Sequence, residues 1–202
     1  LNNQEMRNAL YQGNATVLIN RLAKMKVFID ATEDTIPANH MKDRYLVLRF
    51  VAFYMWQKGI TKDVDTNEVL EYRSNLEDFL GKTMRFLNRL DSENDLFKEL
   101  EFRFAKAMEL ASQLIPLGGF RLPSSPGKKR PINMAFFESF SYLLSNLTGD
   151  KELLNGKIKQ AYMQLMHESQ YLDTLTHSVD SGTQTDERYK IINQYISELN
   201  LC

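Results

Sequence analysis

The stretch KDRYLVLRFVAFYMWQK, residues 42–58, decides the fold of this chain. Wound as a helix, it places apolar side chains on nearly all faces, so we expect it to lie at the buried centre of the domain. Gly59 follows directly and predicts the end of the helix. A chain of 202 residues is long enough to surround such a helix with one good core.

Arg49 interrupts this apolar run between Leu48 and Phe50. A buried guanidinium must be paired or hydrogen-bonded, because an unpaired charge inside a protein is costly. Two interpretations remain open. Either a carboxylate or a helix C-terminus holds Arg49 in the core, or its side chain turns toward a cleft that binds an anion.

Helical spacing of apolar residues continues through most of the chain, and no segment shows the period of two that indicates a strand. Residues 26–41 are predicted to be irregular, and a polar stretch rich in Ser, Thr and Gly precedes the last helix. We therefore predict an all-α fold, a single domain of about seven to eight packed helices with the third at its centre. The other predicted helices cover about residues 3–12, 15–25, 66–90, 95–114, 132–147, 151–167 and 185–199.

The composition is that of an ordinary globular protein, with 43% hydrophobic residues, 25% charged residues and a formal net charge of −1. This charge gives no overall attraction to nucleic acid or to an anionic membrane, so binding of either kind requires a local patch. The longest apolar run is shorter than the roughly 20 residues that span a bilayer, so no membrane partner is expected. The one cysteine, Cys202, excludes an internal disulfide and indicates a reducing compartment, so we expect a cytoplasmic protein.

The segment FRLPSSPGKKRPIN, residues 120–133, differs from the rest of the chain because it holds three of the five prolines and no acid. Its cations are Arg121, Lys128, Lys129 and Arg130. Cations beside the start of a helix suit a phosphate group, and such contacts dominate nonspecific affinity for nucleic acid. Pro131 fits the first position of the following helix, and Asn133 just inside that helix can point back and close the loop. The alternative is a solvated linker between two helices.

The sequence carries no familiar catalytic signature: it has no glycine-rich phosphate loop, no GxSxG and no HExxH. Its histidines, His40, His167 and His177, do not have the spacing of metal ligands on one helix. We therefore expect no metal site, no cofactor and no complete active site within this chain, and we assign no catalytic residue.

Three stretches resemble, in the same order, the motifs of one bacterial family: LNNQEMRNALYQG at 1–13, DRYLVLRFVAFY at 43–54 and GGFRLPSSPGKKRPINMAFFE at 118–138. This family of unknown function is typified by the N-terminal domain of GmrSD-type modification-dependent restriction enzymes. The resemblance covers most of residues 1–147, the expected helical core, whereas the C-terminal helices in residues 148–202 match only loosely. The matching residues are Asn3, Gln4, Glu5, Arg7, Arg49, Phe120, Arg121, Arg130, Pro131, Asn133 and Glu138.

The resemblance implies that the chain is the helical part of a longer protein. In the family, a ParB-like subdomain with a DGQQR-type motif linked to nucleotide hydrolysis precedes the first stretch, and many members end in an HNH-type nuclease domain. This sequence contains neither part. A nucleoside triphosphate and a divalent metal would belong to those parts, and the N-terminal subdomain is the expected partner. The sequence leaves open whether the chain forms a homo-oligomer.

We therefore expect a helical module of a bacterial restriction or anti-phage defence protein that contacts the phosphates of DNA or of a nucleotide. The expected phosphate-binding residues are Arg121, Lys128, Lys129, Arg130 and Asn133. The resemblance implies that further residues face the cleft with the N-terminal subdomain and organise the site, namely Asn3, Gln4, Arg7, Arg49 and Glu138. The alternative is a scaffold, in which these motifs pack on the N-terminal subdomain or on a second copy of the chain.

Overall fold

The computed structural model describes residues 3–37, 41–125, 127–149 and 151–201. These residues form ten α-helices and no strand or sheet, apart from an isolated antiparallel bridge between Lys62 and Val69. The all-α prediction is therefore confirmed. The helices are α1 (Asn3–Leu10), α2 (Asn14–Ala23), α3 (Lys26–Ala31), α4 (Lys42–Gln57), α5 (Leu76–Arg89), α6 (Asp95–Ser112), α7 (Met134–Asn146), α8 (Lys151–Leu165), α9 (Ser169–Thr176) and α10 (Gly182–Leu201), with one 3₁₀ helix, η2 (Ile115–Leu117).

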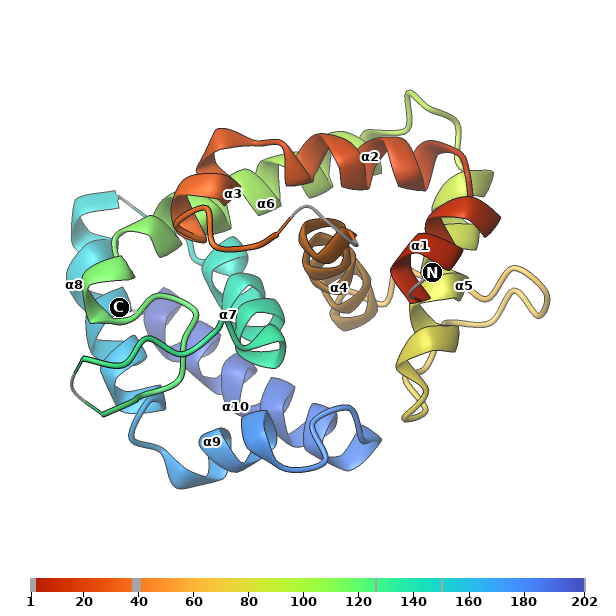
Figure 1. Cartoon of the computed structure of the whole chain (residues 1–202). Coiled ribbons are helices and arrows are strands. Elements are labelled where there is room, and N and C mark those ends of the chain that lie inside the picture. Colours follow the sequence, from red (N-terminus) through yellow and green to blue (C-terminus); the bar gives the residue numbers. More distant parts are fainter. Residues whose placement is uncertain (1–2, 38–40, 126, 150, 202) are drawn as a thin grey trace.

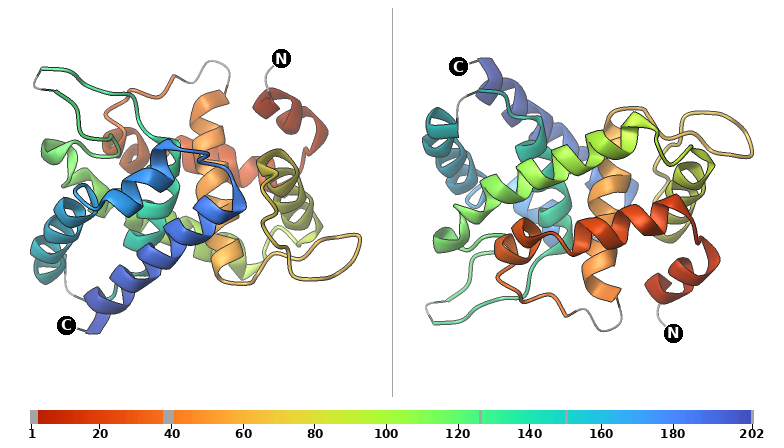
Figure 2. Two further views of the ribbon diagram at one scale, coloured as in Figure 1. Left: turned by 90° about the horizontal axis from the view of Figure 1, so that it is seen from below. Right: turned by 90° about the horizontal axis from the view of Figure 1, so that it is seen from above.

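Helices α4 and α7 form the centre of the domain, where they pack against each other (Figure 1). Helices α2 and α6 cross over them on one side, and α10 packs against α7 on the other side, next to α9 (Figure 2). Helix α5 contacts α2 and α4 at one end of the domain, and α8 lies at the opposite end (Figure 1).

The centre is buried as the sequence predicts. Every residue from Leu46 to Met55 in α4 is buried, so the predicted third helix is indeed the central one. Helix α7 is buried just as fully, from Ala135 to Ser145. One hydrophobic cluster runs from Ala15 in α2 to Ile192 in α10, so the helices at both ends of the chain share a core. None of the described helices is long and apolar enough to cross a membrane.

The helix predicted over residues 66–90 is wrong in its first part, because α5 begins only at Leu76. The side chain of Asn75 caps it by accepting a hydrogen bond from the backbone N–H of Asp78 at 3.1 Å. Asn67 and Ser74 have φ angles of 59° and 60°, which a right-handed helix cannot contain. The segment before Leu76 is therefore an irregular connection that buries apolar side chains without being helical.

Two short helices were missed, and they raise the count from the predicted seven or eight to ten. Helix α3 lies within residues 26–41, which were predicted to be irregular, and α9 lies in the polar stretch before the last helix. Both have eight residues or fewer, too few for a repeating apolar stripe to be recognised. The last helix also begins earlier than predicted, at Gly182.

The predicted start of the helix after the basic loop is shifted as well. Helix α7 begins at Met134, and Asn133 is its N-cap, so Pro131 precedes the helix and does not occupy its first position. The Asn133 side chain accepts a hydrogen bond from the backbone N–H of Phe136 at 2.8 Å. This bond satisfies one of the free N–H groups of the first helical turn.

Candidate functional site

The basic loop, residues 120–133, runs from η2 to α7 and returns close to its starting point (Figure 1). Its two ends are joined, because the backbone N–H of Asn133 donates to the carbonyl oxygen of Phe120 at 2.9 Å. The Phe120 ring is buried and packs edge-on against Phe137 with ring centroids 4.7 Å apart. The core thus anchors both ends of the loop, which presents Lys128, Lys129 and Arg130 at the surface between them.

Two cations of the loop share one carboxylate, that of Glu33 in the turn after α3. The buried Arg121 forms an ion pair with one oxygen of Glu33, and Lys129 contacts the other oxygen at 2.6 Å. A second nitrogen of Arg121 donates to the hydroxyl of Thr35 at 2.9 Å. The hydrogen bond from Lys129 and the charge of Arg121 hold the pKa of Glu33 below its ordinary value of 4.5, although partial burial opposes this shift.

Three further cations in or beside the loop have no acidic partner among the described residues. Lys128 and Arg130 in the loop and Lys42 at the start of α4 are exposed, and none of them makes an ion pair with another described residue. Glu33 is the one acid among the described residues that line the cavities beside the loop. This region therefore has a local excess of positive charge in a chain whose net charge is −1.

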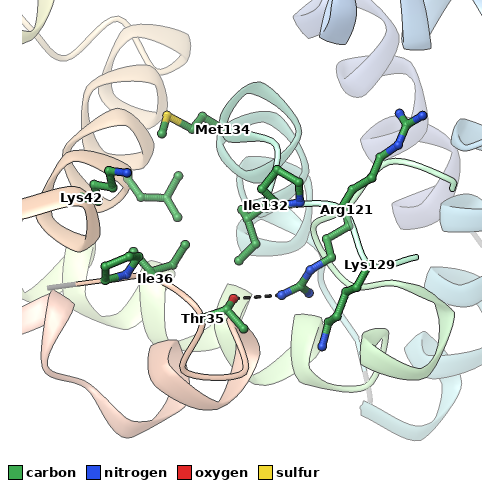
Figure 3. A pocket seen from close by; sticks show the side chains of 11 residues that line it. Thr35, Ile36, Lys42, Arg121, Lys129, Ile132 and Met134 are labelled. Carbon is green, nitrogen blue, oxygen red and sulfur yellow. Dashed lines mark hydrogen bonds between the residues drawn. The ribbon is translucent and has the colours of Figure 1, made fainter. Parts of the chain in front are cut away.

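Two cavities flank the basic loop. The first has a volume of about 490 Å³ and lies between the loop, the connection after α3 and the start of α4 (Figure 3). The second, of about 420 Å³, lies on the side of α8 and η2. Arg121, Lys129 and Arg130 line both cavities. The first cavity is lined by Thr35, Ile36, Pro37, Lys42, Leu46, Arg121, Lys129, Arg130, Pro131, Ile132 and Met134.

Asn133 differs from the other predicted phosphate-binding residues because both ends of its side chain are already used. Besides capping α7, it donates a hydrogen bond through its amide nitrogen to the backbone oxygen of Leu175 at 3.0 Å. Asn133 thus connects the end of the basic loop with α9.

Arg49 and Glu138 meet in a second group, inside the core. Arg49 donates from Nε to Glu138 at 2.5 Å, and Arg188 contacts the other oxygen of Glu138 at 3.2 Å. Arg49 also contacts Asp180 at 2.9 Å. The side chains of Glu138 and Arg188 are fully buried, and that of Arg49 is 3% exposed. Of the two interpretations of Arg49, the structure thus shows the one in which a carboxylate holds it in the core.

Burial raises the pKa of the Glu138 carboxyl, and the positive charges of Arg49 and Arg188 act in the opposite direction. Burial is the largest single effect on Arg49 and disfavours its charged form, but Glu138, Tyr45 and Asp180 together outweigh it and raise the pKa of the guanidinium well above its ordinary value. The charged forms of Glu138 and Arg49 therefore stabilise each other.

Arg7 and Gln4 form a third group, between α1, α4 and α5. Arg7 forms an ion pair with Glu77 and donates two hydrogen bonds to the side-chain oxygen of Gln4, at 3.2 and 3.0 Å. Its guanidinium lies 5.3 Å from the centre of the Tyr45 ring, and that of Arg49 lies 5.7 Å from the same ring. Tyr45 thus connects this group with the buried charge cluster through two cation–π contacts. The side chain of Asn3 lies outside the described part of the chain.

The predicted site residues are therefore divided among three places. The loop cations lie together at the cavities, Arg49 and Glu138 lie in the core, and Arg7 lies beside Tyr45. Sequence reasoning missed Glu33, Lys42 and Arg188, because each belongs to a segment distant in the sequence from the predicted residues beside which it lies. The run of cations in the loop was a signal for an acidic partner, but it does not indicate which acid that is.

Comparison with known proteins adds no relative, since no protein-family model, no curated protein and no solved structure matches this chain. The interpretation of the site therefore depends on its own residues. Within the described ranges, no group of three or more His, Cys, Asp or Glu side chains could hold a metal ion.

Proposed function

We propose that this chain is a helical module that binds the phosphates of DNA with its basic loop, within a bacterial restriction or anti-phage defence protein. The observation that carries the proposal is the set of unpaired cations at the loop: Lys42, Lys128 and Arg130 face no carboxylate in the described structure. Cations held at the surface by an anchored loop can approach a phosphate backbone without first breaking internal ion pairs. The defence context is supported only by the three sequence motifs.

A scaffold function is the second candidate, and a different observation favours it. Arg121 is buried and already bound to Glu33 and Thr35, and Asn133 caps α7. Arg121 and Asn133 are therefore committed to holding helices together. On this interpretation, the exposed cations contact an acidic surface of another domain.

Titration of fluorescent duplex DNA at about 50 and 200 mM salt distinguishes the two functions. Each phosphate contact contributes about 0.9 to the slope of log affinity against log salt, so three contacts weaken binding roughly 40-fold over this range. We expect the variant Lys128→Ala/Lys129→Ala/Arg130→Ala to lose most of this salt dependence together with its affinity.

The matched control removes the same charge elsewhere, with Lys24→Ala/Lys98→Ala/Lys159→Ala on exposed positions of the C-terminal end of α2, of α6 and of α8. This variant is expected to bind DNA nearly as well as the natural chain. If both variants lose DNA affinity equally, or if the natural chain does not bind DNA at the lower salt, the DNA function is rejected and the scaffold function remains.

A further inference from the structure

The cavity of about 490 Å³ beside the basic loop is lined by aliphatic and by cationic side chains (Figure 3). The aliphatic part of its wall consists of Ile36, Leu46, Ile132 and Met134. Leu46 is buried, Ile36 and Ile132 are half-buried, and Met134 is 38% exposed. The cavity volume lies within the range of about 300–1,000 Å³ that is typical of small-molecule sites. This wall therefore leaves apolar surface that a ligand could remove from water.

Cations line the cavity from two opposite walls: Lys42 comes from α4, beside Ile36, and Arg121 and Lys129 come from the basic loop across from it (Figure 3). The structure shows directly that the loop wall binds a carboxylate, because Glu33 contacts both Arg121 and Lys129. Glu33 supplies one negative charge for these two cations, and Lys42 adds a third cation that has no partner among the described residues. The cavity can therefore accept a further anionic group by charge.

The lining argues against a nucleobase and for an aliphatic chain. No aromatic side chain is among the described residues of the lining, so a base would find no ring on which to stack. Among the described lining residues, Thr35 is the one neutral polar side chain, and it is already used twice: its hydroxyl donates to the backbone oxygen of Thr32 at 2.6 Å and accepts from Arg121. The lining side chains that the structure describes thus offer aliphatic contact and positive charge, and no free neutral hydrogen-bonding group.

We propose that this cavity binds a small amphipathic anion, an aliphatic chain that ends in a phosphate or a carboxylate. The anionic head lies at Lys129 on the loop wall, and Lys42 adds positive charge from the wall opposite. The chain packs against Ile36, Ile132 and Met134. Glu33 competes for the same cations and limits the affinity of the site. This inference does not rest on the binding of DNA, although Lys42 is used in both proposals.

Isothermal titration calorimetry with alkyl phosphates tests the proposal. Each buried methylene contributes about a fourfold gain in affinity, so octyl phosphate is expected to bind about 15-fold more tightly than hexyl phosphate. Octanoate compared with octyl phosphate shows which head group is preferred. Inorganic phosphate and 1-octanol, which each lack one half of the ligand, are expected to bind at least tenfold more weakly. Equal affinity for the two chain lengths, or no binding of octyl phosphate, would overturn the proposal.

Two exposed positions provide variants that keep the fold. Met134→Ser and Lys42→Ala are each expected to weaken octyl phosphate binding about fivefold, by loss of apolar contact and of charge respectively. Val17→Ser on α2, 61% exposed and far from the cavity lining, is the control and is expected to bind normally. Glu33→Gln is expected to tighten binding, because it removes the competing carboxylate.

These variants also separate this inference from the proposed DNA function. Met134→Ser is expected to bind DNA like the natural chain. If it also binds octyl phosphate like the natural chain, the cavity assignment fails while the DNA function stands. Conversely, retained binding of octyl phosphate in a chain that does not bind DNA would reject the DNA function alone.

Discussion

The buried charge cluster gives the sharpest test of this structure, and the test is the substitution Glu138→Gln. Glutamine keeps the shape of the side chain and removes its negative charge. Both guanidinium groups that contact Glu138 are buried, that of Arg49 at 2.5 Å and that of Arg188 at 3.2 Å. After the change, the one carboxylate that Arg49 retains is that of Asp180, which is 48% exposed. Arg188 retains no carboxylate among its described partners.

The magnitude follows from the cost of leaving a buried charge without its partner, which is about 3–5 kcal/mol. A typical domain has a free energy of unfolding of about 5–15 kcal/mol, so the variant loses a large share of its stability. For a chain of this length, about 2–4 °C is lost per kcal/mol, so the melting temperature should fall by roughly 6–20 °C.

Urea unfolding followed by far-UV circular dichroism at pH 7 measures this loss. The control is Ser141→Ala, one turn further along α7, because the buried Ser141 hydroxyl has no partner within the described structure. Removing this hydroxyl should lower the free energy of unfolding by less than about 0.5 kcal/mol, or should raise it. If Glu138→Gln costs less than about 1 kcal/mol, the carboxyl is already neutral in the folded protein, and the reasoning about the cluster is refuted.

Three other predictions concern the basic loop and the start of α2. Asn133→Ala should cost about 1–2 kcal/mol in urea unfolding, because the cap of α7 is lost, whereas a change within error would show that the cap is dispensable. The ion pairs of Glu33 lower the pKa of its carboxyl in the folded protein. Their contribution to stability is therefore present above pH 4.5, the ordinary pKa of this carboxyl, and is lost as the pH falls through the lowered folded value. Glu33→Gln should therefore cost about 1 kcal/mol at pH 7 and almost nothing at about pH 3, and a difference that does not change with pH would contradict this. Gly13→Ala should destabilise by more than about 1 kcal/mol in thermal unfolding, because Gly13 has a φ of 149° and an added Cβ would lie 2.6 Å from Asn88 Oδ1; an unchanged melting temperature would show that both can adjust.

The sequence predicts the fold class and the central helix because residues 42–58 can bury their apolar side chains in only one way. A helix that is apolar on nearly all faces must be surrounded by others. The predicted start of α5 was wrong, also for a physical reason. Val69, Tyr72 and Leu76 have the spacing of one helix face. However, Val69 and Tyr72 belong to an irregular connection, in which Tyr72 is buried and Val69 is 49% exposed. Burial alone does not distinguish a helix from a connection that packs on the core.

The candidate site could be predicted only where its residues are contiguous. The cations of the basic loop are visible as a run, but Glu33 is 88 residues from Arg121 and 96 from Lys129. The part that Arg188 plays is harder still to predict from the sequence. It lies between Glu187 and Tyr189 in a helix with many charged residues, where an arginine is ordinarily exposed. Nothing local indicates that this arginine is fully buried, because its burial depends on how α10 packs against α7.

The contacts of Glu138 have a consequence for synthesis on the ribosome. They reach 89 residues back to Arg49 in α4 and 50 residues forward to Arg188 in α10. Translation proceeds at about 5–20 residues per second, so α4 and α7 leave the exit tunnel seconds before α10 does. During that interval the nascent chain holds a carboxylate with only one of its two guanidinium partners and an apolar face of α7 that α10 does not yet cover. Folding of this domain should therefore be completed after translation of α10, and ribosome-bound chains that stop before Arg188 should be sensitive to protease and attractive to chaperones.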